Sequence, residues 1–237
     1  FNLALALENI QIKTEIPELA ECITKILQKR TLVNPVHIAT ATISLLKQTS
    51  SIKNVLDLHS KDKMSSSLLQ IIEALSRESA LLEIIKASPL PDAQFEKLFK
   101  DIRAEILTGS VDLYKKKNFS TFQVALALHC NTNEYLYDQT KEETEFLNRL
   151  EASVEKKISR GKQPDPQELL CLASYKVLNE YSWISKITFP TRLKELQIRQ
   201  VTEPQIEEQL KNKIKRHTII TDNTSRIVGQ QYEKRPY

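Results

Sequence analysis

The residue pair that most resembles a reactive centre in this 237-residue chain is His129 beside Cys130. A thiol next to an imidazole could act as nucleophile and base, but the surrounding Leu- and Ala-rich stretch predicts a helix. Adjacent side chains of a helix point about 100° apart, so these two cannot form the close contact that such catalysis needs. We predict that Cys130 is a small buried apolar residue and that the chain has no catalytic residue.

The remaining histidines and cysteines do not form a metal-ligand pattern. None of the other histidines has a second ligand at helical spacing, namely His37, His59 and His217. The cysteines are odd in number and far apart, at Cys22, Cys130 and Cys171, which indicates neither a disulfide framework nor a zinc site. We therefore predict no metal and expect a reducing, cytoplasmic location.

Three carboxylates form the densest acidic group, Glu142, Glu143 and Glu145. A pair of carboxylates that works as acid and base would need a cleft. This polar stretch, with Lys141 beside it, instead predicts a solvated helix face.

The positive charge of the chain is concentrated near its end. Residues 186–216 hold eight Lys and Arg against four Glu, a surplus of four that equals the formal net charge of +4. Lys211, Lys213, Lys215 and Arg216 could contact phosphates. Aromatic residues for base stacking are sparse there, so a solvated face is favoured, and nucleic-acid binding is a weaker alternative.

Glycine usage limits the possible chemistry. The three glycines, Gly109, Gly161 and Gly229, are far apart. A phosphate-binding or dinucleotide-binding loop needs clustered glycines, because the backbone must turn tightly against the ligand. Such a loop cannot be built here, and a repeating strand-helix-strand pattern is not indicated.

The elements that must position these residues are predicted to be helices. A hydrophobic content of 41% with 27% charged residues allows a buried core, and no run of about 18 apolar residues could span a bilayer. Helix starts are predicted at Asn34-Pro35, at Asp92, at Ser120 with Gln123 for 122–137, at Asp165-Pro166-Gln167-Glu168 for 169–178, and at Thr202-Glu203-Pro204 for a helix to about His217. Further helices are expected at 18–29, 66–87 and 142–159.

The predicted fold is therefore all-α, a helical bundle or irregular helical array with at most one short strand, at 217–221. We expect an N-terminal helical array at 1–90, a helical domain at 91–217 and a linker at 218–237, with a soft boundary at 89–92 across which one core could continue.

Asn133, Glu134 and Tyr135 form a polar group that closes a predicted helix end. Amide, carboxylate and phenol groups can satisfy the unpaired backbone groups of a helix end or bond to a neighbouring helix. A structural role is favoured, and contact with a ligand is the alternative.

Four segments, in order, resemble a bacterial family of methyltransferases that use S-adenosylmethionine (SAM) and carry tetratricopeptide or other helical repeats upstream. They are the helix Asp92-x-x-Phe95-Glu96-x-Leu98-Phe99, the group Asn133-Glu134-Tyr135, the stretch Thr202-Glu203-Pro204, and Val228-Gly229-Gln230-Gln231-Tyr232-Glu233-Lys234-Arg235-Pro236-Tyr237. The last is similar to the family's Val-x-x-Gln-Tyr-Glu-Glu-Asn-Pro-Tyr-Pro-Arg-Trp, which leads into the catalytic domain. Here Lys234-Arg235 stands where the family has Glu-Asn.

The resemblance implies that the chain ends inside this lead-in segment and that a SAM-dependent catalytic domain follows it. Residues expected to lie at a SAM pocket are Gln231, Tyr232, Glu233, Pro236 and Tyr237. SAM is then a cofactor of the parent enzyme and not of this chain. Partners implied are a methyltransferase domain, in cis or in trans, and a protein substrate, with no membrane.

Two classes of function are thus open. In the first, the chain is a non-catalytic helical part of a methyltransferase that presents a substrate or regulates the enzyme. In the second, it is a stand-alone helical protein-interaction or adaptor module.

Overall fold

The computed structural model describes residues 2–8, 10–29, 33–61, 64–109, 117–211, 213 and 228–229, without the side chains of 117–120. Every regular element in these ranges is a helix, which confirms the predicted all-α fold. The short strand predicted at 217–221 lies outside them.

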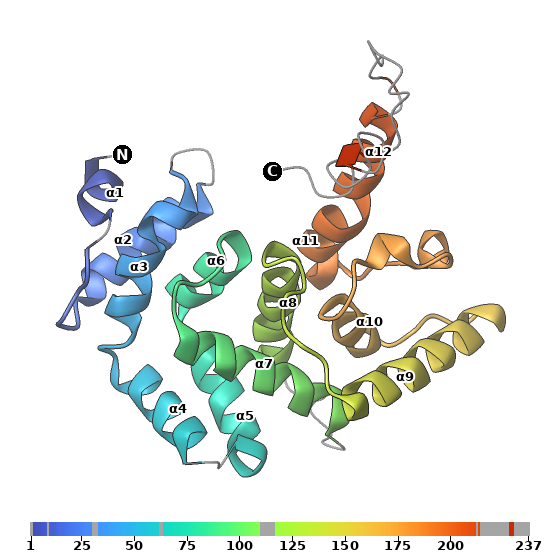
Figure 1. Ribbon diagram of the computed structural model, residues 1–237, viewed down its shortest axis with the longest axis horizontal. Coiled ribbons are helices and arrows are strands. Elements are labelled where there is room, and N and C mark those ends of the chain that lie inside the picture. The colour runs from blue at the N-terminus through green and yellow to red at the C-terminus, as the bar shows by residue number, and fades with distance from the viewer. Residues whose placement is uncertain are drawn as a thin grey trace.

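The first half of the chain forms short helices that follow one another along an arc (Figure 1). They are α1 (Asn2–Leu7), α2 (Pro17–Gln28), α3 (Pro35–Leu46), α4 (Ser50–Ser60), α5 (Met64–Leu75) and α6 (Ser79–Ala87). Helix α6 packs against α2 and α3 on one side and against α8 on the other, so it lies between the two halves of the fold.

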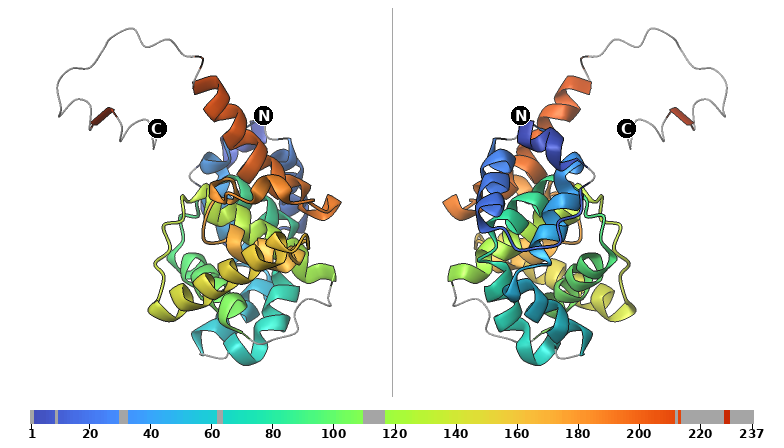
Figure 2. Two further views of the ribbon diagram at one scale, coloured as in Figure 1. Left: turned by 90° about the vertical axis from the view of Figure 1, so that its right-hand side faces the viewer. Right: turned by 90° about the vertical axis from the view of Figure 1, so that its left-hand side faces the viewer.

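The second half continues the arc and ends in a projecting helix (Figures 1 and 2). It contains α7 (Ala93–Thr108), α8 (Lys117–Thr132), α9 (Lys141–Ser159) and α10 (Pro166–Ala173). Short 3₁₀ turns at Leu178–Glu180, Ile184–Lys186 and Thr191–Leu193 lead to α11 (Lys194–Gln197), a π-helical turn (Ile198–Thr202) and α12 (Glu203–Lys211).

Three of the predicted helix starts, at Asn34, Asp92 and Asp165, are confirmed. The Asn34 side chain accepts from the Val36 N–H at 3.2 Å at the start of α3. Asp92 accepts from Gln94 and Phe95 N–H, both at 3.1 Å, at the start of α7. At α10 the Glu168 carboxylate accepts from the Asp165 N–H at 2.8 Å, as a capping box requires.

Other predicted bounds are wrong. Helix α8 begins at Lys117, so Ser120 lies inside it, and it ends at Thr132 instead of residue 137. Thr202 is not a cap either, because the chain is already helical from Lys194 onward. The segment 66–87 is two helices, and α10 ends at Ala173.

The apolar core continues across the predicted boundary at 89–92. One cluster of buried side chains contains residues of α1 to α8, from Ala4 to Cys130, together with Cys171 of α10. A second cluster, from Ala127 to Val201, packs α8, α9, α10 and α11 together. Helix α8 belongs to both clusters and therefore links them.

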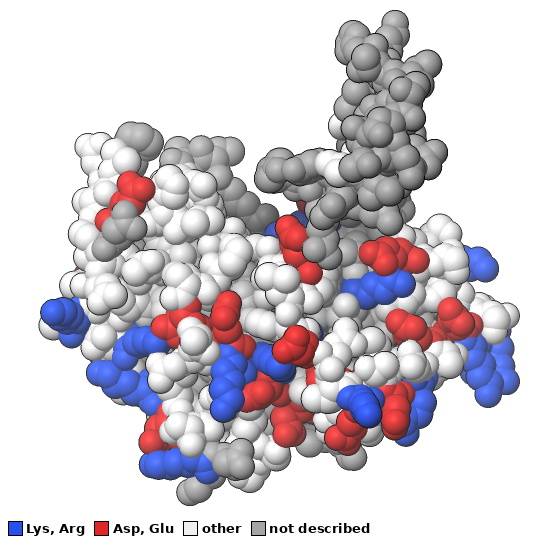
Figure 3. Space-filling view, viewed as in Figure 1, with Lys and Arg blue, Asp and Glu red and all other residues white. Residues whose placement is uncertain are grey.

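Charged side chains of both signs are interspersed over the lower part of the face seen in Figure 3. On that face the described residues form no large field of one sign, and electrostatic attraction to a polyanion would need one.

Candidate functional site

Two of the residues considered for chemistry, His129 and Glu143, lie in a buried polar network between α7, α8 and α9. Arg103 of α7 is at its centre, with a side chain that is 1% exposed. Its Nη2 donates to Glu143 Oε1 at 3.3 Å and to the Asp138 carbonyl at 2.9 Å. The guanidinium thus anchors both the α8–α9 connection and the start of α9.

Two tyrosines enclose this ion pair. The Arg103 Cζ lies 4.2 Å from the centre of the Tyr175 ring and 5.6 Å from that of Tyr137. The Tyr175 hydroxyl donates to Glu143 Oε1 at 2.6 Å. A cation between aromatic faces is favoured most where water is excluded, so these contacts offset part of the cost of burying the charge.

The predicted solvated face is therefore wrong for Glu143, which is 2% exposed. Its Oε2 accepts from the Thr140 N–H at 2.9 Å, and Thr140 Oγ1 accepts from the Glu143 N–H at 3.1 Å. Burial alone would raise the pKa of Glu143, but the Thr140 and Tyr175 hydrogen bonds and the Arg103 charge together lower it. Glu142 and Glu145 are exposed, as predicted.

His129 completes the network as a neutral base. Its Nδ1 lies 3.1 Å from the Ile85 carbonyl, so Nδ1 carries the proton, and its Nε2 lies 2.8 Å from the Tyr137 hydroxyl and accepts from it. Burial lowers the pKa of His129 to about 4. The ring faces α6 and Tyr137 and not Cys130.

The cysteines are not activated. Cys130 is fully buried, as predicted, and burial raises the pKa of its thiol to about 12. Cys171 is also buried, with its pKa raised to about 12 for the same reason, while Cys22 is exposed. A thiol needs a lowered pKa to act as a nucleophile near neutral pH, so neither buried cysteine is suited to that role.

Asn133, Glu134 and Tyr135 lie at the end of α8. Glu134 and Tyr135 adopt left-handed backbone conformations, with φ of 56° and 57°, and the Tyr135 N–H donates to the Cys130 carbonyl at 2.8 Å. The Tyr135 hydroxyl donates to the Ala173 carbonyl of α10 at 3.3 Å. These contacts end α8 and attach it to α10.

Asn133 differs from the other two in one respect. The residue is 7% exposed, and its buried Oδ1 has no hydrogen-bond partner within the chain. None of the three described pockets is lined by Asn133.

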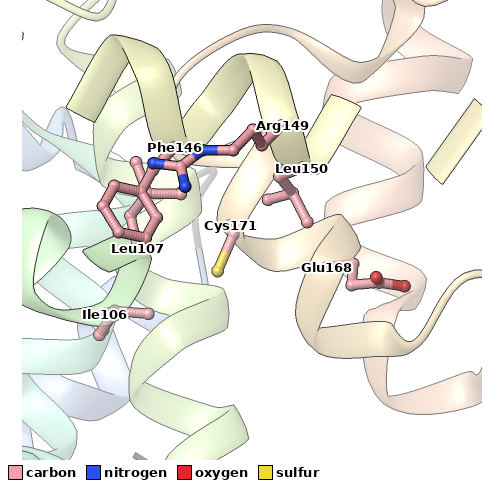
Figure 4. A pocket seen from close by; sticks show the side chains of 7 residues that line it. All are labelled: Ile106, Leu107, Phe146, Arg149, Leu150, Glu168 and Cys171. Carbon is pink, nitrogen blue, oxygen red and sulfur yellow. The ribbon is translucent and has the colours of Figure 1, made fainter. Parts of the chain in front are cut away.

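A pocket of about 320 Å³ opens between α7, α9 and α10 (Figure 4). Its wall is largely apolar, and the Arg149 guanidinium lies over the Phe146 ring with Cζ 4.3 Å from the ring centre. Glu168, at the edge, is bonded to Lys157 Nζ at 2.6 Å. The pocket can accept an apolar group. Of the two titratable side chains that line it, the Cys171 thiol is protonated because its pKa is raised, and the Glu168 carboxylate is paired with Lys157.

A smaller cavity of about 220 Å³ lies where α6 and α8 meet the chain around α11. Lys86 Nζ joins Glu83 Oε1 at 2.9 Å and Glu195 Oε2 at 3.3 Å. The Arg199 guanidinium donates to the Lys86 carbonyl and to Thr132 Oγ1. The Lys86–Glu195 ion pair and the Arg199 hydrogen bonds fix the C-terminal helices to the centre of the fold.

Several predicted site residues cannot be placed. The five proposed SAM-pocket residues, Gln231, Tyr232, Glu233, Pro236 and Tyr237, lie outside the described residues, as do Lys215 and Arg216. Lys211 and Lys213 are exposed. Within the described ranges, no three His, Cys, Asp or Glu side chains gather as metal ligands, and no helix is long and apolar enough to cross a membrane.

Comparison with known protein families, with curated proteins and with solved structures found no match to this chain.

Proposed function

We propose that this chain is a non-catalytic helical module that supports the work of another domain. The observation that carries the proposal is the state of its buried titratable groups. His129 is neutral and bonded at both nitrogens, Cys130 and Cys171 are thiols with raised pKa values, and Glu143 is paired with Arg103. Groups in these states stabilise helix packing and are poorly suited to proton transfer or nucleophilic attack.

We favour a SAM-dependent methyltransferase as the domain that this module supports. Support comes from the resemblance of the lead-in segment and from the place of the other matching segments. Asp92 caps α7, and Asn133 to Tyr135 end α8. The Phe99 ring of α7 lies 5.4 Å from the His129 ring of α8, so the helices that carry these two resembling segments are in contact. The module would present a protein substrate or regulate the enzyme, while SAM binds elsewhere.

A stand-alone interaction module is the second candidate. The observation that favours it is α12, which has no buried residue and carries Ile206 and Leu210 at 47% and 54% exposure. Apolar side chains on a projecting helix are typical of a surface that another protein covers.

Reading the coding sequence beyond Tyr237 separates these two candidates. A continuing frame that encodes Pro-Arg-Trp and then a glycine-rich strand-turn-helix supports the methyltransferase module. A stop codon directly after Tyr237 would contradict the methyltransferase module and favour the stand-alone adaptor module.

A further inference from the structure

Helix α12 (Glu203–Lys211) extends from the body of the molecule and buries none of its side chains (Figures 1 and 2). It continues without a break from α11 and the π-helical turn, and Gln205 Nε2 donates to Asn179 Oδ1 of the body at 3.0 Å. The side of α12 that carries Gln205 therefore faces the body, and the opposite side faces solvent.

Four exposed residues form one stripe on α12: Glu203, Ile206, Leu210 and Lys213. Their spacing alternates between three and four residues, which keeps them on one helix face. At about 100° per residue, the stripe lies roughly 80° to 160° around the helix from Gln205. Lys213 lies two residues beyond the end of α12, where its N–H donates to the Leu210 carbonyl at 2.9 Å.

The stripe is complementary to itself. Read in order it is acidic, apolar, apolar and basic. If a second α12 lies antiparallel on it, Ile206 meets Leu210 of the other copy, and Glu203 meets Lys213. A two-fold axis repeats each of these pairs, so one stripe supplies two apolar layers between two ion pairs. A parallel arrangement would instead place like charges together.

We propose that a second copy of this chain covers the stripe, with the two α12 helices paired antiparallel. The contact is small, because a helix of nine residues is only about 14 Å long. Stable protein interfaces bury at least about 1,200 Å² in total. The dimer is therefore weak and dissociates on dilution.

Charge-exchange variants of the 237-residue chain test this pairing by sedimentation velocity between roughly 10 µM and 1 mM, a range that spans weak association. The unchanged chain should shift from monomer to dimer as its concentration rises. Glu203→Lys and Lys213→Glu should each lose the dimer, because each places two like-charged pairs across the axis. Mixing the two variants should restore a heterodimer, since every cross-chain pair is then opposite in charge.

Glu208→Lys is the matched control, because it makes the same charge change on an exposed residue of α12 that lies outside the stripe. It should dimerise like the unchanged chain. A chain that stays monomeric over the whole range would overturn the proposal. A dimer that survives both single variants, or a mixture that does not associate, would overturn it as well.

Discussion

Arg103 and Glu143 form an ion pair, 3.3 Å between Nη2 and Oε1, that joins the middle of α7 to the first turn of α9 with both side chains almost fully buried. A buried charge is costly unless it is paired, so this contact constrains how the two helices meet. The aromatic rings of Tyr137 and Tyr175 and the carbonyl of Asp138 complete its surroundings.

Replacing Glu143 by Gln should destabilise the protein by about 3 kcal/mol, because Arg103 then remains as an uncompensated buried charge. The Gln side chain keeps an oxygen that can accept from the Thr140 N–H, so the helix cap is retained. The measurement is urea unfolding at neutral pH. Glu142→Gln, an exposed neighbour, should change the free energy of unfolding by less than about 0.5 kcal/mol. Equal effects of the two variants would contradict the burial of this ion pair.

Stability should fall as the pH is lowered from 6.5 towards 4. The pKa of His129 is depressed from 6.5 to about 4 in the folded protein, so the unfolded chain takes up its proton first. The native state is then disfavoured progressively, by roughly 3 kcal/mol once the pH is below both values. Urea unfolding at several pH values measures this slope.

His129→Asn isolates the histidine's share of the slope. The Asn amide can still donate to the Ile85 carbonyl but does not titrate. The variant should show a flatter stability profile between pH 6.5 and about 4 than the unchanged chain, since the depressed pKa is removed. Identical profiles would show that His129 is not the group responsible.

Glu134→Gly should stabilise the protein by roughly 0.5 kcal/mol, because Gly adopts a left-handed conformation without the cost that other residues incur. Glu134 is exposed and has a φ of 56°, so the variant loses little else. Glu145→Gly, inside the right-handed helix α9, should instead destabilise by about 1 kcal/mol. Thermal unfolding of both variants measures the difference, and the same sign of change in both would argue against the positive φ.

Thiol titration should separate the three cysteines. In the native protein Cys22 is exposed while Cys130 and Cys171 are buried. One thiol should therefore react quickly with an aromatic disulfide reagent, and the other two only after unfolding. Cys22→Ser should remove the fast phase. A fast phase that persists in this variant would mean that Cys130 or Cys171 is accessible.

Features determined by local contacts were predictable from the sequence. Asn34 and Asp92 cap helices through hydrogen bonds to residues two and three positions along the chain, so the amino acid types reveal them. The all-α class followed from the helical periodicity and from the wide spacing of the glycines.

Features determined by distant partners were not predictable in this way. The burial of Glu143 depends on Arg103 and Tyr175, which precede and follow it by 40 and 32 residues. A local signal was nevertheless present, since Thr140-x-x-Glu143 is the pattern of a capping box. That pattern predicts the start of α9, but not the ion pair inside the core.

The end of α8 was misjudged for a related reason. Glu134 and Tyr135 adopt positive φ, and no glycine at these positions indicates this in the sequence. The conformation is held by hydrogen bonds from the Tyr135 hydroxyl to the Ala173 carbonyl and from the Tyr135 N–H to the Cys130 carbonyl. Packing against α10 therefore overrides the local preference for right-handed helix.

The central claim, that this chain supports a catalytic domain without holding its cofactor, is tested most directly by titrating SAM into the 237-residue chain in a calorimeter. We predict no saturable heat at SAM concentrations up to about 1 mM, which would place any dissociation constant above the range of a specific cofactor site. Saturable binding at micromolar affinity would contradict the claim.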